Sequence, residues 1–204
     1  RAHIAEEMEA RGIKVLLGTQ HTKIEKTATG LVNVCTNGHA FESDAVMFAT
    51  GREPYTEGLG LEAAGVELAA NGAVKVDDYS RSSIDNIWAV GDVTDRINLT
   101  PVAIREGQAF AMTEFHGQPT TFDHEMVASA VFTQPQIGSV GLSEAEARHK
   151  YGKVDIYLAK FRPMKETFYG GHQRALVKLV VEQGSERILG CHVVSPDAPE
   201  IIQM

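Results

Sequence analysis

The stretch "IWAVGDVTDRINLTPVA", which runs from Ile87 to Ala103, decides the fold of this chain. Its first four residues form a short apolar run, which is typical of a buried strand. Gly91 ends the run, and Asp92 follows at the carboxyl end of the expected strand. Ligands of open α/β sheets bind at the carboxyl ends of the strands, so the stretch predicts an α/β fold with Asp92 at a ligand site. From position alone, capping of a turn is an equally good interpretation of Asp92.

The same stretch predicts the start of a helix. Thr100 is a favourable N-cap and Pro101 suits the first helical position, so we expect a helix from Pro101 to about Phe115. Its start presents unpaired N–H groups and a partial positive charge. A flavin nucleotide suits both features, because its ribityl hydroxyls match the Asp92 carboxylate and its ring edge becomes electron-rich on reduction. The amides of Leu99 and Thr100 would stabilise that edge.

Composition limits the class of protein. The 204 residues leave room for one or two domains, and the net charge of −8 argues against a nucleic-acid-binding surface. No apolar run approaches the ~20 residues of a membrane span. Cys35 and Cys191 lie far apart, which favours a reducing compartment, the cytoplasm, over a disulfide framework or metal cluster. The chain begins inside a helical pattern and ends as an apolar run starts, so we expect an internal piece of a longer protein.

The first expected segment, residues 1–52, mixes one helix with several strands. The helix precedes an apolar strand at Ile13–Gly18. Three more strand-like runs follow, separated by turns at Gly30 and at Asn37–Gly38. The last run becomes continuously apolar at residues 45–49, as expected for a strand covered on both faces. The segment predicts the closing half of a βαβ-type domain with an antiparallel meander.

Two further segments differ in texture. Residues 53–122 are rich in loops, with a short helix expected at Leu61–Ala64 and a strand at Ala73–Val76. Residues 123–204 carry five strand-like runs and one helix between the second and third runs, and Ser143 begins that helix with a capping box. This pattern predicts an antiparallel α+β domain with helices on one face of the sheet.

Four stretches carry a family resemblance: "FATGREPYTEGLGLEAAGV", "IWAVGDVTDRINLTPVAIREG", "SAVFTQPQIGSVGLSE" and "FRPM". Over essentially its whole length the chain resembles the class I pyridine nucleotide–disulfide oxidoreductases. "LTPVA" after "GDV" favours the branch of glutathione and trypanothione reductases over dihydrolipoamide dehydrogenase or mercuric reductase. The resemblance implies an α/β plus α+β architecture, in which the C-terminal part of a flavoprotein with two dinucleotide-binding domains precedes an antiparallel-sheet dimerisation domain.

The resemblance also implies a division of the chain into three domains. Residues 1–52 would be the C-terminal part of an NADPH-binding domain, and residues 53–122 the C-terminal part of an FAD-binding domain. Residues 123–204 would be the dimerisation domain, truncated at its C-terminus.

Candidate cofactor-binding residues follow from the resemblance and from the helix start: Gly51, Asp92, Asn98, Leu99, Thr100 and Ala130. Asp92 and Thr100 match FAD-contacting positions of the family. Gly51 matches the point where the NADPH-binding domain turns back into the FAD-binding domain. Asn98 and Ala130 match positions near the nicotinamide ring, and Ala130 would act only through its backbone.

Other positions concern the substrate and the chemistry. Met164 in "FRPM" matches a position that lines the disulfide-substrate cleft, although a core methionine is an equally good interpretation. Gln108 stands where some glutathione reductases carry an arginine for a glutathione carboxylate, which leaves the disulfide substrate open. The sequence lacks the family's redox-active cysteine pair and its acid–base histidine. We therefore assign no catalytic and no metal-binding residue, and interpret Cys35 and Cys191 as structural.

The resemblance implies an NADPH-dependent FAD enzyme that reduces glutathione disulfide and works as a homodimer. In this family a hydride passes from NADPH to the flavin, the flavin reduces a cysteine pair, and a thiolate attacks the substrate disulfide. Trypanothione or another low-molecular-weight disulfide is an alternative substrate. A hypothesis of a different class is that the chain as it stands is a non-catalytic fragment, acting only as a dimerisation module.

Overall fold

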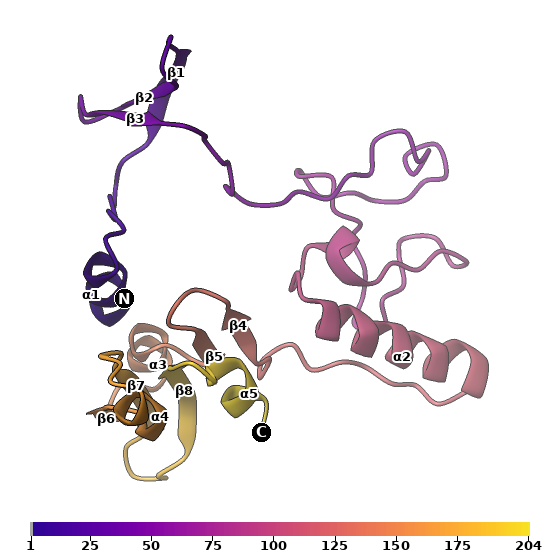
Figure 1. Cartoon of the computed structure of the whole chain (residues 1–204). Coiled ribbons are helices and arrows are strands. Elements are labelled where there is room, and N and C mark those ends of the chain that lie inside the picture. The colour runs from indigo at the N-terminus through magenta and orange to yellow at the C-terminus, as the bar shows by residue number, and fades with distance from the viewer. Residues whose placement is uncertain (1) are drawn as a thin grey trace. The chain divides into compact units, whose positions relative to one another are not determined.

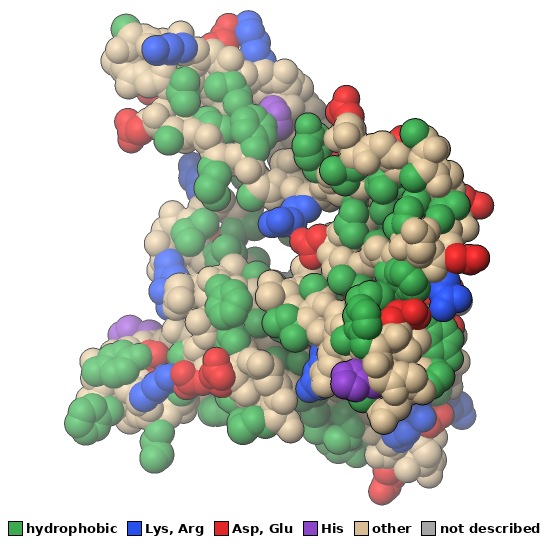
Figure 2. All heavy atoms as spheres, turned by 90° about the vertical axis from the view of Figure 1, so that its right-hand side faces the viewer, with side chains coloured by type: hydrophobic (Ala, Val, Ile, Leu, Met, Phe, Trp, Pro, Cys, Tyr) green, Lys and Arg blue, Asp and Glu red, His purple; other side chains and the backbone are tan. Residues whose placement is uncertain are grey.

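The computed structural model describes residues 2–204 and contains two compact units (Figure 1). One unit ends at Arg52, and the other runs from Glu53 to Met204. No helix within residues 2–204 is long and apolar enough to cross a membrane. Hydrophobic side chains lie between charged ones at many places on the face that Figure 2 shows.

The first unit contains a helix and a small antiparallel sheet. Helix α1 spans Ala2–Ala10. The sheet has the order β1-β2-β3 (Figure 1) and consists of strands β1 (His21–Lys26), β2 (Leu31–Cys35) and β3 (Ala40–Ser43). This confirms the expected meander, because each polar or glycine-containing turn reverses the chain between consecutive strands.

Two strands expected in the first unit do not form. Residues 13–18 and 45–49 have no regular secondary structure, and neither pairs with a strand within residues 2–204. Leu17 and Met47 are 84% and 87% exposed. An apolar run supplies strand propensity, but a strand forms only when its N–H and C=O groups pair with a neighbouring strand. The prediction of these two strands was wrong because pairing is not visible in local sequence.

The loop-rich part of the second unit is held by turns. The helix expected at Leu61–Ala64 is a run of turns, in which the Val66 amide donates to the Leu61 carbonyl at 2.9 Å. The strands expected at residues 73–76 and 87–90 are reduced to isolated bridges, Leu68 with Val74 and Arg81 with Trp88. These predictions were wrong for the same reason, since neither run has a ladder partner among the described residues.

Helix α2 spans Thr100–His116 and follows the 3-10 turn η1 (Gly91–Thr94). Pro in the first helical turn is confirmed. The N-cap is Leu99, with an extended backbone and no side-chain cap, so the assignment of Thr100 as N-cap was wrong by one residue. Thr100 is already helical, and its hydroxyl is therefore not placed to accept the capping hydrogen bond.

The rest of the second unit is a five-stranded antiparallel sheet with the order β4-β5-β8-β7-β6. Its strands are β4 (Ser129–Val131), β5 (Ile137–Gly141), β6 (Val154–Phe161), β7 (Ala175–Glu182) and β8 (Ile188–Val194). All five expected runs are therefore confirmed as one antiparallel sheet, in which β8 is the central strand and lies between β5 and β7.

Three helices accompany the sheet: α3 (Glu144–Tyr151), α4 (Met164–Phe168) and α5 (Ala198–Gln203). The capping box of α3 is confirmed, because Ser143 and Glu146 exchange backbone and side-chain hydrogen bonds. Helices α4 and α5 were not expected from the sequence, because they are short and lie where apolar and turn-forming residues alternate.

The helices cover both faces of this sheet. Lys178 in β7 donates to Glu144 of α3 at 2.6 Å, whereas the neighbouring Val177 packs against the buried cluster of Ala198 and Ile202 in α5. Successive side chains of a strand point to opposite faces. The expectation of helices on one face was therefore wrong. The central strands are apolar on both faces, so their sequence does not show which face a helix covers.

Candidate functional site

The turn between the expected ligand-site strand and helix α2 is closely packed. Gly91 opens η1 with a left-handed backbone (φ 73°). A Cβ atom at Gly91 would lie 2.9 Å from the Cβ of Ala103 in α2. Both observations require glycine, because other residues resist this backbone region and because a methyl group would overlap α2. The turn that carries Asp92 thus lies directly against the first turns of α2.

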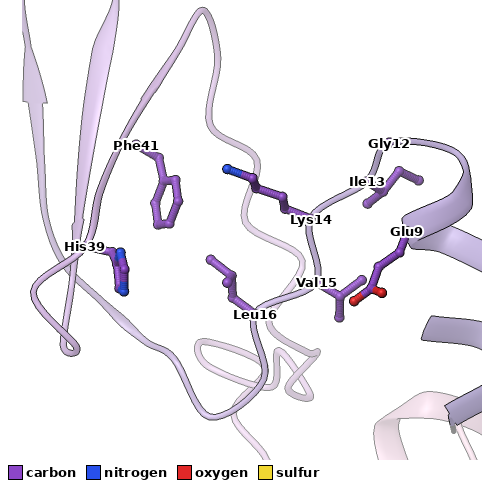
Figure 3. A pocket seen from close by; sticks show the side chains of 8 residues that line it. All are labelled: Glu9, Gly12, Ile13, Lys14, Val15, Leu16, His39 and Phe41. Atoms are coloured by element: carbon purple, nitrogen blue, oxygen red, sulfur yellow. The ribbon is translucent and has the colours of Figure 1, made fainter. Parts of the chain in front are cut away.

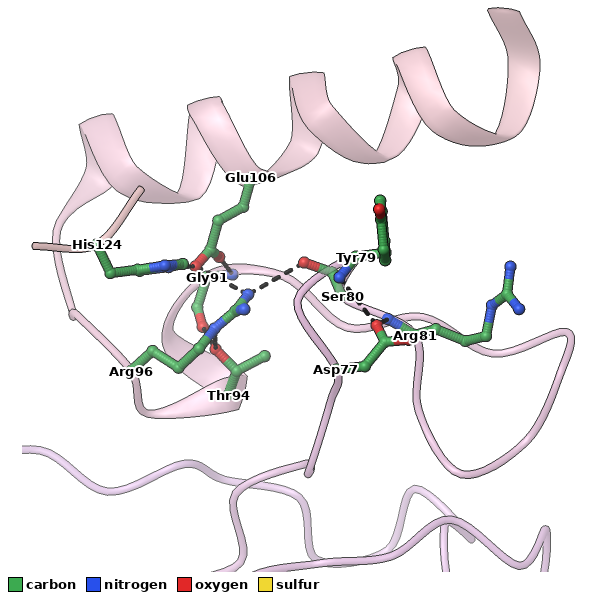
Figure 4. Close-up of polar contacts among 9 residues, drawn as sticks. All are labelled: Asp77, Tyr79, Ser80, Arg81, Gly91, Thr94, Arg96, Glu106 and His124. Carbon is green, nitrogen blue, oxygen red and sulfur yellow. Dashed lines mark hydrogen bonds and ion pairs between the residues drawn. The ribbon is translucent and has the colours of Figure 1, made fainter. Parts of the chain in front are cut away.

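A buried carboxylate holds this turn. Glu106 of α2 is 2% exposed, and its Oε2 accepts the Gly91 amide at 2.6 Å. Its Oε1 lies 2.9 Å from a guanidinium nitrogen of Arg96 and 2.7 Å from Nε2 of His124. Figure 4 shows Glu106 pointing from the helix into this group. A buried carboxylate is costly unless it is paired, and here three donors from separate places in the sequence surround it.

Further hydrogen bonds support Arg96. Its Nε donates to Thr94 at 3.2 Å, and its Nη2 donates to the buried Ser80 at 3.1 Å (Figure 4). Ser80 has a positive φ of 65°, and Asp77 holds this conformation by accepting the amides of the residues on either side. Arg96 is therefore fixed from two directions, which is typical of a preorganised polar cluster.

Three of the candidate residues lie in η1 or just before α2. Asp92 is exposed in η1. Asn98 donates to Asp95 at 2.9 Å, within the loop between η1 and α2. The Leu99 amide, expected to donate to a ligand, donates to the Ile97 carbonyl at 2.9 Å. A tight turn before the helix uses this N–H group.

A pocket of about 710 Å³ opens beside the start of α2. Leu99 and Thr100 line it together with Ala130 of β4, so three of the candidate residues meet there although 30 positions separate Thr100 from Ala130. Apolar side chains such as Val102 and Phe132 form much of the wall, and Arg105 lies at the same pocket. Asp92 and Asn98 are not among the residues that line it.

The remaining candidates lie elsewhere. Gly51 is in the first unit, exposed and outside any helix or strand. Met164 is the first residue of α4 and is 84% exposed, which excludes the interpretation as a core methionine. Gln108 is exposed on α2, where Arg105 donates to its side-chain oxygen at 3.4 Å. The structure thus brings three candidate cofactor-binding residues together at one pocket, Leu99 and Thr100 at the start of α2 and Ala130 in β4, but not the other three.

The first unit has its own pocket of about 480 Å³ (Figure 3). Leu16, Phe41 and His39 lie along it, and Lys14 and Glu9 supply its charges. None of the candidate cofactor residues contributes to it. Its wall comes largely from residues 13–16, part of the unpaired apolar run described above.

The two cysteines occupy structural positions. Cys35 is buried in β2 of the first unit, and Cys191 is half-buried in β8 of the second. Burial raises the pKa of the Cys191 thiol, which lowers its reactivity. Among residues 2–204, no cluster of three or more His, Cys, Asp or Glu side chains is arranged to hold a metal ion.

The pocket beside α2 fits the ring end of a flavin. Small-molecule sites usually enclose ~300–1,000 Å³ between mainly apolar walls with a few polar groups. The pocket has such walls, and the amide of Thr100 at the helix start has no hydrogen-bond partner within residues 2–204. That amide and the helix dipole suit a ring edge that gains negative charge. Of the two amides expected there from the sequence, Thr100 thus offers the donor without a partner within residues 2–204, and Leu99 donates to Ile97.

The Glu106 cluster was not expected from the sequence. The spacing of residues in the sequence does indicate that Glu106 is buried, because Val102, Glu106 and Ala109 lie on one face of α2 and are its buried residues. A charged residue on the buried stripe of a helix needs a specific partner. The partners, Arg96 and His124, cannot be identified from this pattern, since no periodicity links them to the helix.

Comparison with known proteins now identifies the class. Residues 1–107 match the family model "Pyridine nucleotide-disulphide oxidoreductase", and residues 127–204 match its dimerisation domain. The chain belongs to the pyridine nucleotide-disulphide oxidoreductase family. It is 53% identical over 203 residues to a glutathione reductase of Burkholderia cepacia, covering 100% of this chain and 45% of that relative. A trypanothione reductase of Trypanosoma congolense is 40% identical over 205 residues, covering 100% and 42%.

A solved structure shows the same fold. The HOCl-induced flavoprotein disulfide reductase RclA from Escherichia coli superposes with a TM-score of 0.87 at 25% identity. The match covers 99% of this chain and 46% of that one. The chain thus spans somewhat less than half the length of these relatives.

Proposed function

We propose that this protein is an NADPH-dependent FAD enzyme that reduces glutathione disulfide. The observation that carries the proposal is the 53% identity to a glutathione reductase across the whole chain. The pocket beside α2 supports it, because its walls and the Thr100 amide suit a flavin ring. FAD, when bound, would accept a hydride from NADPH and pass electrons to a disulfide.

The roles of individual residues are part of the proposal. Thr100 would donate its amide to the electron-rich edge of the ring, and Asp92 would accept hydrogen bonds from the ribityl hydroxyls. Ala130 and Asn98 would lie near the nicotinamide, and Gly51 would lie where the two nucleotide-binding domains meet. Leu99 would form part of the pocket wall, since its amide already donates a hydrogen bond to the Ile97 carbonyl.

The proposed assembly is a homodimer formed through residues 123–204, in the cytoplasm. Residues 1–52 and 53–122 would belong to the NADPH-binding and FAD-binding domains. The match of residues 127–204 to a dimerisation domain supports the first point. The exposed Met164 on α4 would contact the disulfide substrate. Size-exclusion chromatography with light scattering tests the assembly, and subcellular fractionation tests the compartment.

The substrate is tested by steady-state kinetics of the full-length protein. NADPH oxidation should be fast with oxidised glutathione and slow with trypanothione disulfide. The reverse order would favour the alternative that the 40% identical trypanothione reductase represents. Gln108 supports this alternative. Its side chain is neutral, whereas the family resemblance implies that some glutathione reductases carry an arginine at this position, which binds a glutathione carboxylate.

A second candidate function concerns the 204 residues by themselves. Cys35 lies in the sheet of the first unit and Cys191 in the sheet of the second, so neither unit contains a pair of cysteines among its described residues. We expect residues 1–204 to show no NADPH-dependent disulfide reduction and to act only as a dimerisation module. Turnover that disappears on substitution of either cysteine by serine would contradict this expectation.

A further inference from the structure

The hydrogen bonds around Glu106 form a closed ring that encloses the η1 turn. The Gly91 amide donates to Glu106 Oε2, and the Gly91 carbonyl accepts the Thr94 hydroxyl at 2.8 Å. Thr94 Oγ1 accepts Arg96 Nε at 3.2 Å, and the Arg96 guanidinium returns to Glu106 Oε1 at 2.9 Å. Figure 4 shows these four residues around the turn. Asp92 lies between Gly91 and Thr94 in the enclosed turn, but the Asp92 side chain takes no part in these four contacts.

We infer that Glu106 is a positioning residue for the flavin site: its buried carboxylate fixes the Gly91–Thr94 turn, and with it Asp92, against the start of α2. The inference rests on the proposed FAD function. Glu106 itself is 2% exposed, so it acts through the turn and not by touching the cofactor.

The geometry explains why a carboxylate is needed. Glu106 must accept a backbone amide on one oxygen and two cationic or potentially cationic side chains, Arg96 and His124, on the other. A neutral amide at this position offers one acceptor oxygen, so it cannot accept on both sides. Hydrogen bonds to charged groups are also stronger than neutral ones. The position of the turn therefore depends on the charge of Glu106 as well as on its size.

The ring also connects helix α2 to residues outside the helix. Arg96 is held by the buried Ser80, and His124 lies just before the region that matches the dimerisation domain. The two elements that would contact the flavin, η1 and the start of α2, are thus tied to each other and to the following segment through one carboxylate. A ligand that bridges Asp92 and Thr100 requires these two elements at a fixed separation.

The test compares FAD binding by variants of the full-length protein. Glu106→Gln keeps the size of the side chain and removes its charge. We expect FAD to dissociate about tenfold or more readily, a change equivalent to the loss of one good hydrogen bond. We also expect a shifted visible circular dichroism band of the bound flavin. The matched control is Glu114→Gln on the same helix, which removes the charge of the Glu114–Arg81 ion pair (3.3 Å), neither of whose side chains belongs to the ring.

A second pair of variants opens the ring without changing any charge. Thr94→Val removes the hydroxyl that both donates and accepts in the ring, whereas Thr94→Ser keeps this hydroxyl and removes only the methyl group. We expect weaker FAD binding for the valine variant and binding close to that of wild type for the serine variant. A purely structural role would lower the unfolding temperature of these variants but leave the dissociation constant and the flavin spectrum unchanged.

Each outcome decides the inference. Equal FAD affinity of wild type, Glu106→Gln and Thr94→Val would overturn it, and so would an equal loss in Glu114→Gln. If Glu106→Gln does not fold, the Thr94 pair decides, and equal affinity of its two members counts against the ring. A wild-type protein that binds no FAD would overturn the proposed function itself, whereas wild-type binding with unaffected variants would overturn only the role of Glu106.

Discussion

Substitution of Gly91 by alanine tests how closely the η1 turn is packed against helix α2. The left-handed backbone of Gly91 (φ 73°) costs an alanine about 1–2 kcal/mol. The added methyl group would lie 2.9 Å from the Cβ of Ala103, and such overpacking costs about 1–3 kcal/mol. We therefore expect Gly91→Ala to lower the free energy of unfolding by about 2–5 kcal/mol in total.

The two contributions can be separated by a double-mutant cycle. Ala103→Gly removes the overlapping methyl group but leaves the backbone strain, and it costs about 1 kcal/mol by itself as a glycine inside a helix. Gly91→Ala combined with Ala103→Gly should therefore show a coupling of about 1–3 kcal/mol. Urea denaturation followed by circular dichroism measures all four free energies of unfolding, and retention of FAD reports on the site.

The control is Gly107→Ala in the same helix, since a Cβ at Gly107 meets no atom within 4 Å. It should stabilise the protein by about 0.5–1 kcal/mol, because alanine loses less backbone entropy than glycine. A Gly91→Ala protein within about 0.5 kcal/mol of wild type would refute the reasoning, as would a double variant without coupling.

Three further predictions concern the five-stranded domain. Ser143→Ala should lower the free energy of unfolding by about 1 kcal/mol in urea denaturation, because it removes the N-cap of α3; an unchanged value would mean that the capping box adds nothing. Hydrogen bonds from Lys178 and then Arg148 lower the pKa of Glu144, so its stabilisation is present at neutral pH and is lost as the pH falls through that lowered pKa. Thermal unfolding from neutral to acidic pH should show Glu144→Gln less stable than wild type at neutral pH and equal at acidic pH; a constant difference would contradict this. Burial raises the pKa of Cys191, so iodoacetamide should modify it more slowly in the folded than in the urea-unfolded protein, as mass spectrometry can measure; equal rates would show that the thiol is accessible.

Local sequence determined those features whose causes lie within a few residues. Strands β6 (Val154–Phe161) and β7 (Ala175–Glu182) form at two of the five strand-like runs expected in residues 123–204, because runs rich in β-branched and other apolar residues are bounded there by turn-forming residues. The capping box of α3 and the proline in the first turn of α2 form where the sequence predicts them. In these cases each hydrogen bond or steric constraint joins residues that are near neighbours in the chain.

Tertiary structure decided the features that depend on distant partners. The apolar run at residues 13–18 has strand propensity, but within residues 2–204 no neighbouring strand accepts its hydrogen bonds, so it stays irregular. Helices α3 and α5 took opposite faces of the sheet, which the two apolar faces of β7 do not specify.

The candidate site likewise combines features that local sequence determines with features that depend on distant partners. The sequence placed Asp92 before a Pro-initiated helix, because a turn and a helix start are local features. It did not show that the Leu99 amide is already bonded to Ile97, or that Glu106 takes its partners from Arg96 and His124. A buried charge is stabilised by whichever donors the fold brings within about 3 Å, and distance along the chain does not determine which donors those are.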